Sequence, residues 1–216
     1  MNDKNYVISI GRQLGSGGST VGKAIADHFG FKYIDKEILL KAAEIMDLPE
    51  ENLEFVDEKK TSVWMALAQT TALGMPYVAE EWQVPTGAQL FNTQVQIMKE
   101  AVSQGSCVII GRCAPHLFRH YEKHTSIFLQ ADMESRMERF GKTIGKDISG
   151  EKGRQMMEKS DQDRAGYYNT YTGRKWMDLR EYDFVLNTTP FTDEQVKKIV
   201  FDYICTRFPE LKDRGL

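Results

Sequence analysis

The chain has 216 residues, of which 41% are hydrophobic, and a formal net charge of -3. This length and composition are typical of one globular domain with a buried core, and the small negative charge gives no electrostatic basis for binding nucleic acid. No segment approaches the ~20 apolar residues of a membrane span, and no signal-peptide pattern is seen. The three widely spaced cysteines fit neither a disulfide framework nor a metal cluster. We therefore expect a cytoplasmic protein that binds neither nucleic acid nor membrane.

The first predicted strand runs from Tyr6 to Ile10 and leads into a glycine-rich loop. After the loop, apolar residues recur at helical spacing as far as Phe29. This order is that of a phosphate-binding loop, because glycines let backbone N–H groups surround an anion and the helix N-terminus adds positive charge. The predicted phosphate-binding residues are Gly15, Ser16, Gly17, Gly18, Ser19 and Thr20.

The loop departs from the nucleotide-binding pattern G-x-x-x-x-G-K-[ST] at an important position. Gly18 stands where that pattern has lysine, and the first glycine of the pattern falls on Arg12. One alternative is therefore a plain strand-to-helix turn that binds no ligand. Arg12, Lys23 or an arginine of the segment 132–180 could supply the missing cation, and Arg12 is the best placed because it stands at the end of the strand. The alternative is that Arg12 pairs with an acidic residue such as Asp35 and only braces the loop.

Four further strands are predicted from short apolar runs at 31–34, 106–111, 126–129 and 184–186. Helices are predicted at about 36–46, at 88–104, and from the N-cap Thr192 to Phe208. The stretch 47–86 is predicted to be a helical insert, with helices near 50–59 and 61–74. Five strands that alternate with helices predict an α/β fold, a doubly wound parallel sheet, in one domain over residues 1–216.

The stretch 132–180 is dense in charge of both signs and is interrupted by glycines at 141, 145, 150 and 153. Two solvated helices joined by a turn account for most of this pattern. The alternative is a mobile lid at about 141–155 that brings arginines over phosphates, since arginine binds phosphate through a bidentate fork.

Taken together, these segments resemble the cytidylate kinase-like branch of the P-loop nucleoside monophosphate kinases. The resemblance covers most of the chain and is loosest at 47–86. It rests on the order of the glycine loop after Gly11-Arg12, Tyr33-Ile-Asp35, the strand ending in Gly111-Arg112, the arginines Arg136 and Arg139, the segment 160–165, and the closing stretch 182–196.

The resemblance implies a P-loop kinase fold and Mg²⁺-dependent transfer of the ATP γ-phosphoryl group to a pyrimidine nucleoside monophosphate such as CMP or dCMP. Loop 15–20 would bind the ATP phosphates, Ser19 and Thr20 would hold Mg²⁺, and Asp35 and Arg112 would bind the acceptor. The implied catalytic residues are Arg12, Arg136, Arg139, Asp161 and Arg164.

Each role has a plainer structural alternative. Asp35 could cap the following helix, Arg112 could form a salt bridge at the sheet edge, and Asp161 could merely pair with Arg164. For the whole protein, the alternatives are a kinase of another small metabolite and a regulatory protein that binds a nucleotide or anion without catalysis. The absent lysine favours the second of these.

Overall fold

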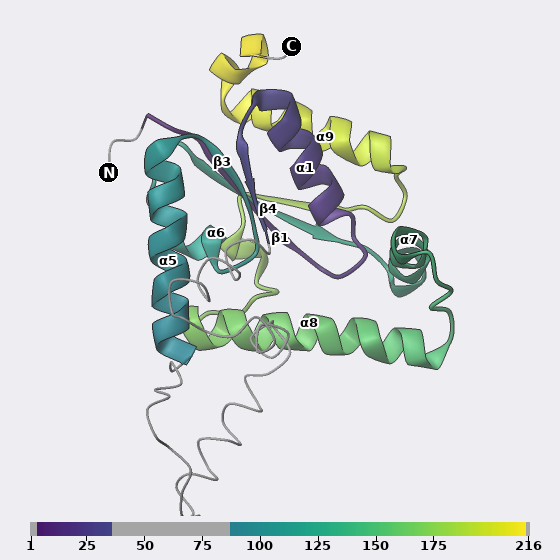
Figure 1. The fold of residues 1–216 in the computed structure, drawn as a ribbon. Coiled ribbons are helices and arrows are strands. Elements are labelled where there is room, and N and C mark those ends of the chain that lie inside the picture. Colours follow the sequence, from purple (N-terminus) through teal and green to yellow (C-terminus); the bar gives the residue numbers. More distant parts are fainter. Residues whose placement is uncertain (1–3, 36–86, 215–216) are drawn as a thin grey trace, which may run out of the picture.

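The computed structural model describes residues 4–35 and 87–214 (Figure 1). The predicted insert 47–86 and the helix predicted at about 36–46 lie outside the described residues. Within the described ranges, five strands form one parallel sheet in the order β2-β3-β1-β4-β5, which confirms the predicted fold class. None of the described helices is long and apolar enough to cross a membrane.

The five strands lie where the apolar runs predicted them. They are β1 (Val7–Arg12), β2 (Lys32–Ile34), β3 (Cys107–Ile110), β4 (His124–Gln130) and β5 (Phe184–Asn187). The strands β1 and β4 are longer than predicted, because Gly11 and Arg12 continue the ladder opposite Phe128 and Leu129, and His124 pairs with Val7. Ladder hydrogen bonds join backbone groups, so polar side chains and glycine do not end a strand that has neighbours on both sides.

The helices connect the strands and cover both faces of the sheet. They are α1 (Gly18–Phe29), α5 (Gly87–Gln104), α6 (Ala114–Leu117), α7 (Met133–Ile144), α8 (Glu151–Thr172) and α9 (Asp193–Arg207). Figure 1 shows α1 and α9 together on one side of the sheet and α5 on the other. Thr192 caps α9 as predicted, through a reciprocal capping box with Gln195.

Two apolar layers hold the sheet between these helices. On one face, Ile8 and Ile10 of β1 pack with residues of α1 and α9, including Ile25 and Ile204. On the other face, alternate strand residues such as Ile109 pack with Met98 and other residues of α5. A sheet that is covered on both faces leaves the carboxyl ends of its strands as the natural place for a ligand.

A third cluster fixes the carboxyl-terminal half of α8 to the same end of the sheet. Tyr168, Trp176 and Tyr182 are buried there around Phe128. The Tyr182 hydroxyl donates to the Trp176 carbonyl oxygen at 2.8 Å. Tyr168 and Trp176 therefore belong to the core. Their burial places α8 where its charged residues reach the strand ends.

The core also contains a histidine that should make folding pH-dependent. His124 is 6% exposed, and its Nε2 lies 2.8 Å from the Ser9 hydroxyl. Burial lowers the pKa of His124 to about 4, partly opposed by Asp183, while Arg207 lowers it further. The pKa of His124 in the folded protein therefore lies below its ordinary value in the unfolded chain. At a pH between these two pKa values, His124 is protonated in the unfolded chain and neutral in the folded protein.

We expect the contribution of His124 to the free energy of unfolding to be fully present above pH ~6.5. It should be lost as the pH drops from there towards 4, by an amount on the order of 3 kcal/mol. Denaturant unfolding measured across this range checks the expectation. The variant His124→Gln keeps a hydrogen-bonding side chain and cannot titrate, so its stability should vary less over the same range. An equal slope in both proteins would contradict the assignment.

Candidate active site

The loop after β1 ends in an uncapped helix N-terminus. Gly17 is the N-cap of α1, with φ 91° and no side-chain cap. The first N–H groups of a helix have no carbonyl one turn earlier to accept them, and they carry the positive end of the helix dipole. The backbone of the loop is therefore suited to an anion, as the sequence predicted, although anion binding itself stays a prediction.

A cavity of about 320 Å³ lies over this helix end, and we call it the donor cavity. Its floor is formed by loop residues 12–15 and 17–20, so Ser19 and Thr20 line it as predicted. Arg139, Lys142 and Arg164 also line it, together with the carboxylate of Asp193, so positive charge predominates in the lining. Such a concentration of positive charge over backbone N–H groups fits a polyphosphate.

Ser16, which the sequence placed among the phosphate-binding residues, lies under the loop instead. Its side chain is buried, and its hydroxyl donates to the Gln13 carbonyl oxygen at 2.8 Å. Its backbone N–H donates to the same oxygen at 3.2 Å. In this structure Ser16 therefore closes the turn of the loop.

Arg136 and Asp161 fix the loop through hydrogen bonds to the backbone of Leu14. The Arg136 Nε donates to the Leu14 carbonyl oxygen at 2.7 Å, and Asp161 accepts the Leu14 backbone N–H at 3.0 Å. The two side chains pair with each other at 2.6 Å, and the Arg136 side chain is only 4% exposed. Both residues thus act on the backbone of the loop in this structure, and a direct catalytic role for either stays a prediction. We call this arrangement the loop clamp.

A second set of contacts fixes the loop from β5 and α7. Arg139 donates to the Gly15 carbonyl oxygen at 3.1 Å and pairs with Asp193 at 3.0 Å. Thr188, fully buried at the end of β5, donates to the Ser16 carbonyl oxygen at 3.2 Å. Arg139 differs from Arg136 because it also lines the donor cavity, where it can reach a phosphate.

Asp35 lies beside the loop, where it contacts three polar side chains. The Tyr33 hydroxyl donates to it at 3.0 Å and the Ser19 hydroxyl at 3.3 Å, while the Arg12 guanidinium lies 3.8 Å away. Burial, and next the charge of Asp35, raise the pKa of Tyr33 far above its ordinary value, so Tyr33 stays a donor. The structure therefore places Asp35 next to the predicted metal residue Ser19.

Arg112 follows β3 in an unusual backbone conformation. Gly111, Arg112 and Cys113 all have positive φ, at 72°, 53° and 59°. Left-handed conformations in consecutive non-glycine residues are strained, and such strain gathers at functional sites. The turn places the largely buried Arg112 guanidinium 5.8 Å from the centre of the Tyr167 ring.

A small space of about 20 Å³, which is room for about one water molecule, lies beside this arginine, and we call it the acceptor cavity. Its lining includes Arg12, Arg112 and Arg164 together with the aromatic side chains of α8 and the segment after it. Arg164 forms the predicted ion pair with Asp161, at 3.5 Å, and lines the cavity as well. Tyr167 donates from its hydroxyl to Gln94 of α5 at 2.7 Å, which ties the lining to α5.

The predicted lid, 141–155, consists of the end of α7, an exposed turn at 145–150 and the start of α8. The turn is closely packed at two glycines. A Cβ on Gly141 would lie 2.8 Å from the Lys146 carbonyl oxygen, and one on Gly153 would overlap the Ile148 carbonyl. The loop clamp fixes the first half of α7, so any closing motion belongs to the part beyond it.

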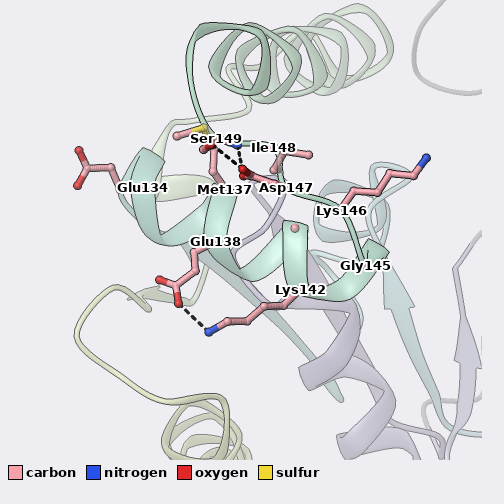
Figure 2. A pocket seen from close by; sticks show the side chains of 10 residues that line it. Glu134, Met137, Glu138, Lys142, Gly145, Lys146, Asp147, Ile148 and Ser149 are labelled. Carbon is pink, nitrogen blue, oxygen red and sulfur yellow. Dashed lines mark hydrogen bonds and ion pairs between the residues drawn. The ribbon is translucent and has the colours of Figure 1, made fainter.

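A larger cavity of about 580 Å³ opens between α7 and this turn (Figure 2). Glu134, Glu138 and Asp147 line it, against Lys142 and Lys146. Lys142 pairs with Glu138 at 2.6 Å, and Asp147 accepts hydrogen bonds from Ser149. Three carboxylates without a glycine loop do not suit phosphate, so the smaller donor cavity is the candidate site.

Comparison with known proteins bears on the family and on the fold. The model of the cytidylate kinase-like family matches residues 7–190. A cytidylate kinase of Methanopyrus kandleri is 23% identical over 205 residues, with 91% of each chain covered. A cytidylate kinase of Pyrobaculum aerophilum is 22% identical over 200 residues, with 93% of each chain covered.

Solved structures support the fold. An uncharacterized protein from Eubacterium ventriosum is similar with a TM-score of 0.66 and 22% identity, over 93% of this chain and 98% of that chain. A gluconokinase from Sinorhizobium meliloti is similar with a TM-score of 0.55 and 14% identity, over 98% of both chains. At these identities the two structures bear on the fold alone.

Sequence reasoning missed several residues of the site. Gln13 and Thr188 support the loop through hydrogen bonds that connect distant parts of the chain. Gln94 lies within an ordinary amphipathic helix, where a single glutamine gives no signal. Tyr33 belongs to the motif Tyr33-Ile-Asp35 that carries the resemblance, but the pattern gave no role for its hydroxyl, which donates to Asp35.

The loop clamp and the predicted lid can be tested together by hydrogen exchange. We expect backbone N–H groups of 145–150 to exchange fast without ligand and more slowly with ATP and an acceptor analogue, because this turn has few buried apolar contacts. Equal protection of the turn in both states would contradict a lid.

The variant Asp161→Asn should accelerate exchange at 13–16, because the buried Arg136 loses its charged partner. The matched control Glu158→Gln changes an exposed carboxylate on the same helix and should leave the loop unchanged. Unchanged exchange at 13–16 in Asp161→Asn would show that the ion pair does not hold the loop.

Proposed function

The chain belongs to the cytidylate kinase-like family, and from this premise we propose that it transfers the γ-phosphoryl group of ATP to a pyrimidine nucleoside monophosphate, CMP or dCMP. The family and the kinase names of its relatives support phosphoryl transfer. The choice of acceptor rests on the names of relatives that are 22% and 23% identical, and it is the part of the proposal that most needs an experiment.

The observation that carries the proposal is that arginines line both the donor cavity and the much smaller acceptor cavity beside it, at the carboxyl ends of the strands. The donor cavity lies over the uncapped N-terminus of α1, and the acceptor cavity contains Arg112 at the end of β3. Phosphoryl transfer requires little covalent chemistry from the protein. It depends on holding donor and acceptor in line and on neutralising the charge of the transferred group.

The residues near the loop fit Mg²⁺. The Ser19 hydroxyl and the Asp35 carboxylate lie 3.3 Å apart beside the donor cavity, and Mg²⁺ prefers hydroxyl and carboxylate oxygens together with water and phosphate oxygens. Ser19 would hold the ion directly and Asp35 through its water, with Thr20 near the same helix end. When bound, Mg²⁺ neutralises charge on the donor phosphates.

The described side chains divide the remaining work. Backbone N–H groups of 17–20 would bind the donor phosphates, while Arg139 and Arg164 would neutralise charge above them. Arg112 would hold the acceptor phosphate. The loop clamp of Arg136 and Asp161 would keep the loop in place while charge moves. No covalent intermediate with the protein is required.

A regulatory protein that binds a nucleotide without catalysis is the second candidate. The glycine at position 18, where P-loop enzymes have lysine, favours it. A simple binder would gain nothing from an acceptor arginine in a strained turn, and Arg112 has that conformation. The acceptor side of the site therefore favours the enzyme.

The proposal predicts measurable ADP release from ATP when CMP or dCMP is present. A coupled assay with Mg²⁺ should compare these two acceptors with UMP, AMP and small hydroxylated metabolites such as sugar acids. We expect the highest kcat/KM for CMP or dCMP. A preference for a metabolite would move the protein to another small-molecule kinase activity, and no turnover with any acceptor would favour the regulatory alternative.

We expect Arg112 to bind the acceptor and to make no contribution to ATP binding. Replacing it with alanine should weaken acceptor binding by ~1–3 kcal/mol, the range for a charge-assisted hydrogen bond. Calorimetry with CMP and, separately, with ATP measures both effects. Arg154→Ala, an exposed arginine on α8, provides the control. An equal loss for both ligands would refute the acceptor role.

A further inference from the structure

We propose that Arg12 is a catalytic residue that contacts the transferred phosphoryl group, and that Gly18 and Gly111 form a slot that holds its side chain. This inference rests on the proposed function and deepens it. It assigns to Arg12 the charge that P-loop enzymes place on the lysine after the last glycine.

The stem of Arg12 lies against Gly18. A Cβ built on Gly18 would lie 2.7 Å from both the Cβ and the Cγ of Arg12, closer than real side-chain atoms approach. Any side chain at position 18 would therefore displace Arg12. A lysine at this position and the observed arginine conformation exclude each other, so the glycine is a condition for the placement of Arg12.

The head of Arg12 lies against Gly111 at the end of β3. A Cβ on Gly111 would overlap the Nη1 atom of Arg12. The same glycine has a φ of 72°, which begins the strained turn that carries Arg112. Arg12 thus extends from the glycine loop to the residue next to Arg112. A side chain at position 18 would meet its rigid stem, whereas one at position 111 would meet only its guanidinium, which would have to move away.

This path runs along the boundary between the two cavities. The donor cavity and the acceptor cavity have two lining residues in common, Arg12 and Arg164. A phosphoryl group that moves from donor to acceptor has to pass this boundary. The guanidinium groups of Arg12 and Arg164 at this boundary would therefore lie next to the phosphoryl group while it is transferred. Electrostatic stabilisation of the transition state has its largest effect on rate there.

The contact with Asp35 is compatible with this role. The Arg12 Nη2 lies 3.8 Å from the Asp35 carboxylate, which is beyond hydrogen-bond distance. The ion pair orients the guanidinium, and the Arg12 side chain keeps 14% of its surface exposed. The competing role is a brace, in which Arg12 acts only through Asp35.

The step that Arg12 would assist is a balanced substitution at phosphorus. A phosphate oxygen of the acceptor forms a bond to the γ-phosphorus, and the bond from that phosphorus to the bridging oxygen of ADP breaks. The electron pair of the broken bond stays on the ADP oxygen. Arg12 donates hydrogen bonds to oxygens of the group in transit and gives up no proton.

The first test replaces the charge and keeps the stem, with Arg12→Gln, beside Arg12→Ala. We expect kcat to fall about 100-fold or more, while the KM for ATP changes by less than about 3-fold, because the contact is made mainly in the transition state. The same pair of measurements in the Asp35→Asn background identifies the role. A persistent loss supports a phosphoryl contact, and its disappearance would show that Arg12 is a brace and overturn the proposal.

The second test concerns the slot. Gly18→Ala should reduce kcat about as much as Arg12→Gln, and the double variant should be no worse than either, because both changes remove the same group. Gly166→Ala is the matched control, since a Cβ at that helical glycine meets nothing within 4 Å. Additive losses would show that Gly18 acts independently of Arg12 and overturn the slot.

A binding measurement keeps this inference separate from the proposed function. We expect aluminium fluoride, which mimics the transferred group, to tighten binding of MgADP and CMP to the wild-type protein by about 10-fold or more. This gain should be lost in Arg12→Gln, with MgADP binding alone unchanged. Absence of turnover would refute the kinase proposal, whereas an unaltered gain in Arg12→Gln, or no gain in the wild-type protein, would overturn the role of Arg12.

Discussion

The hydrogen bonds between the loop clamp and Leu14 are the constraint on which the rest of the site depends. Arg136 holds the Leu14 carbonyl oxygen, Asp161 holds its N–H, and the two side chains pair at 2.6 Å. Removing one partner of such a buried pair costs about 3–5 kcal/mol. Because Arg136 belongs to α7 and Asp161 to α8, both helices are positioned by the loop that they support. The glycine loop, where we propose that phosphate binds, is therefore held in shape by contacts from outside the loop.

The parallel sheet by itself brings the residues of the candidate site together. The carboxyl ends of all five strands share one edge, and a residue from each helps to form the site. Arg12 ends β1 and Asp35 follows β2, while Arg112, Asp132 and Thr188 follow the other three strands. Asp132 caps α7 through the Ser135 N–H at 2.7 Å, and this cap fixes the start of the helix that carries Arg136 and Arg139. The cationic cavities thus follow from strand order and helix starts.

Much of this arrangement could be predicted from local pattern. Apolar runs gave the strands, and the glycine loop before an amphipathic helix gave the candidate phosphate site. Pattern could not tell that Arg136 is buried under the loop while Arg139, three residues later, lines the donor cavity. The two residues have the same chemistry and lie on the same helix. Their difference comes from tertiary contacts to Leu14 and Asp161, which are remote in sequence. The same holds for Ser16, whose burial reflects the turn it closes, and for Thr188 and Gln94.

Gly18 allows two interpretations, depending on whether it is considered alone or together with Arg12. Against the lysine of the usual loop, a glycine at this position suggests lost catalysis. The structure pairs the glycine with an arginine whose stem fills the space over it, so two positions that differ from the usual loop are sterically linked. An arginine from the end of β1 approaches from the side of β3 and Asp35, whereas a lysine from the loop itself would approach over the donor phosphates. In the proposed kinase, the charge of Arg12 would therefore lie nearer the acceptor than the charge of such a lysine. In such a site the cation would act on the group in transit more than on the bound nucleotide, which is the physical condition for an effect on rate that exceeds the effect on ATP affinity.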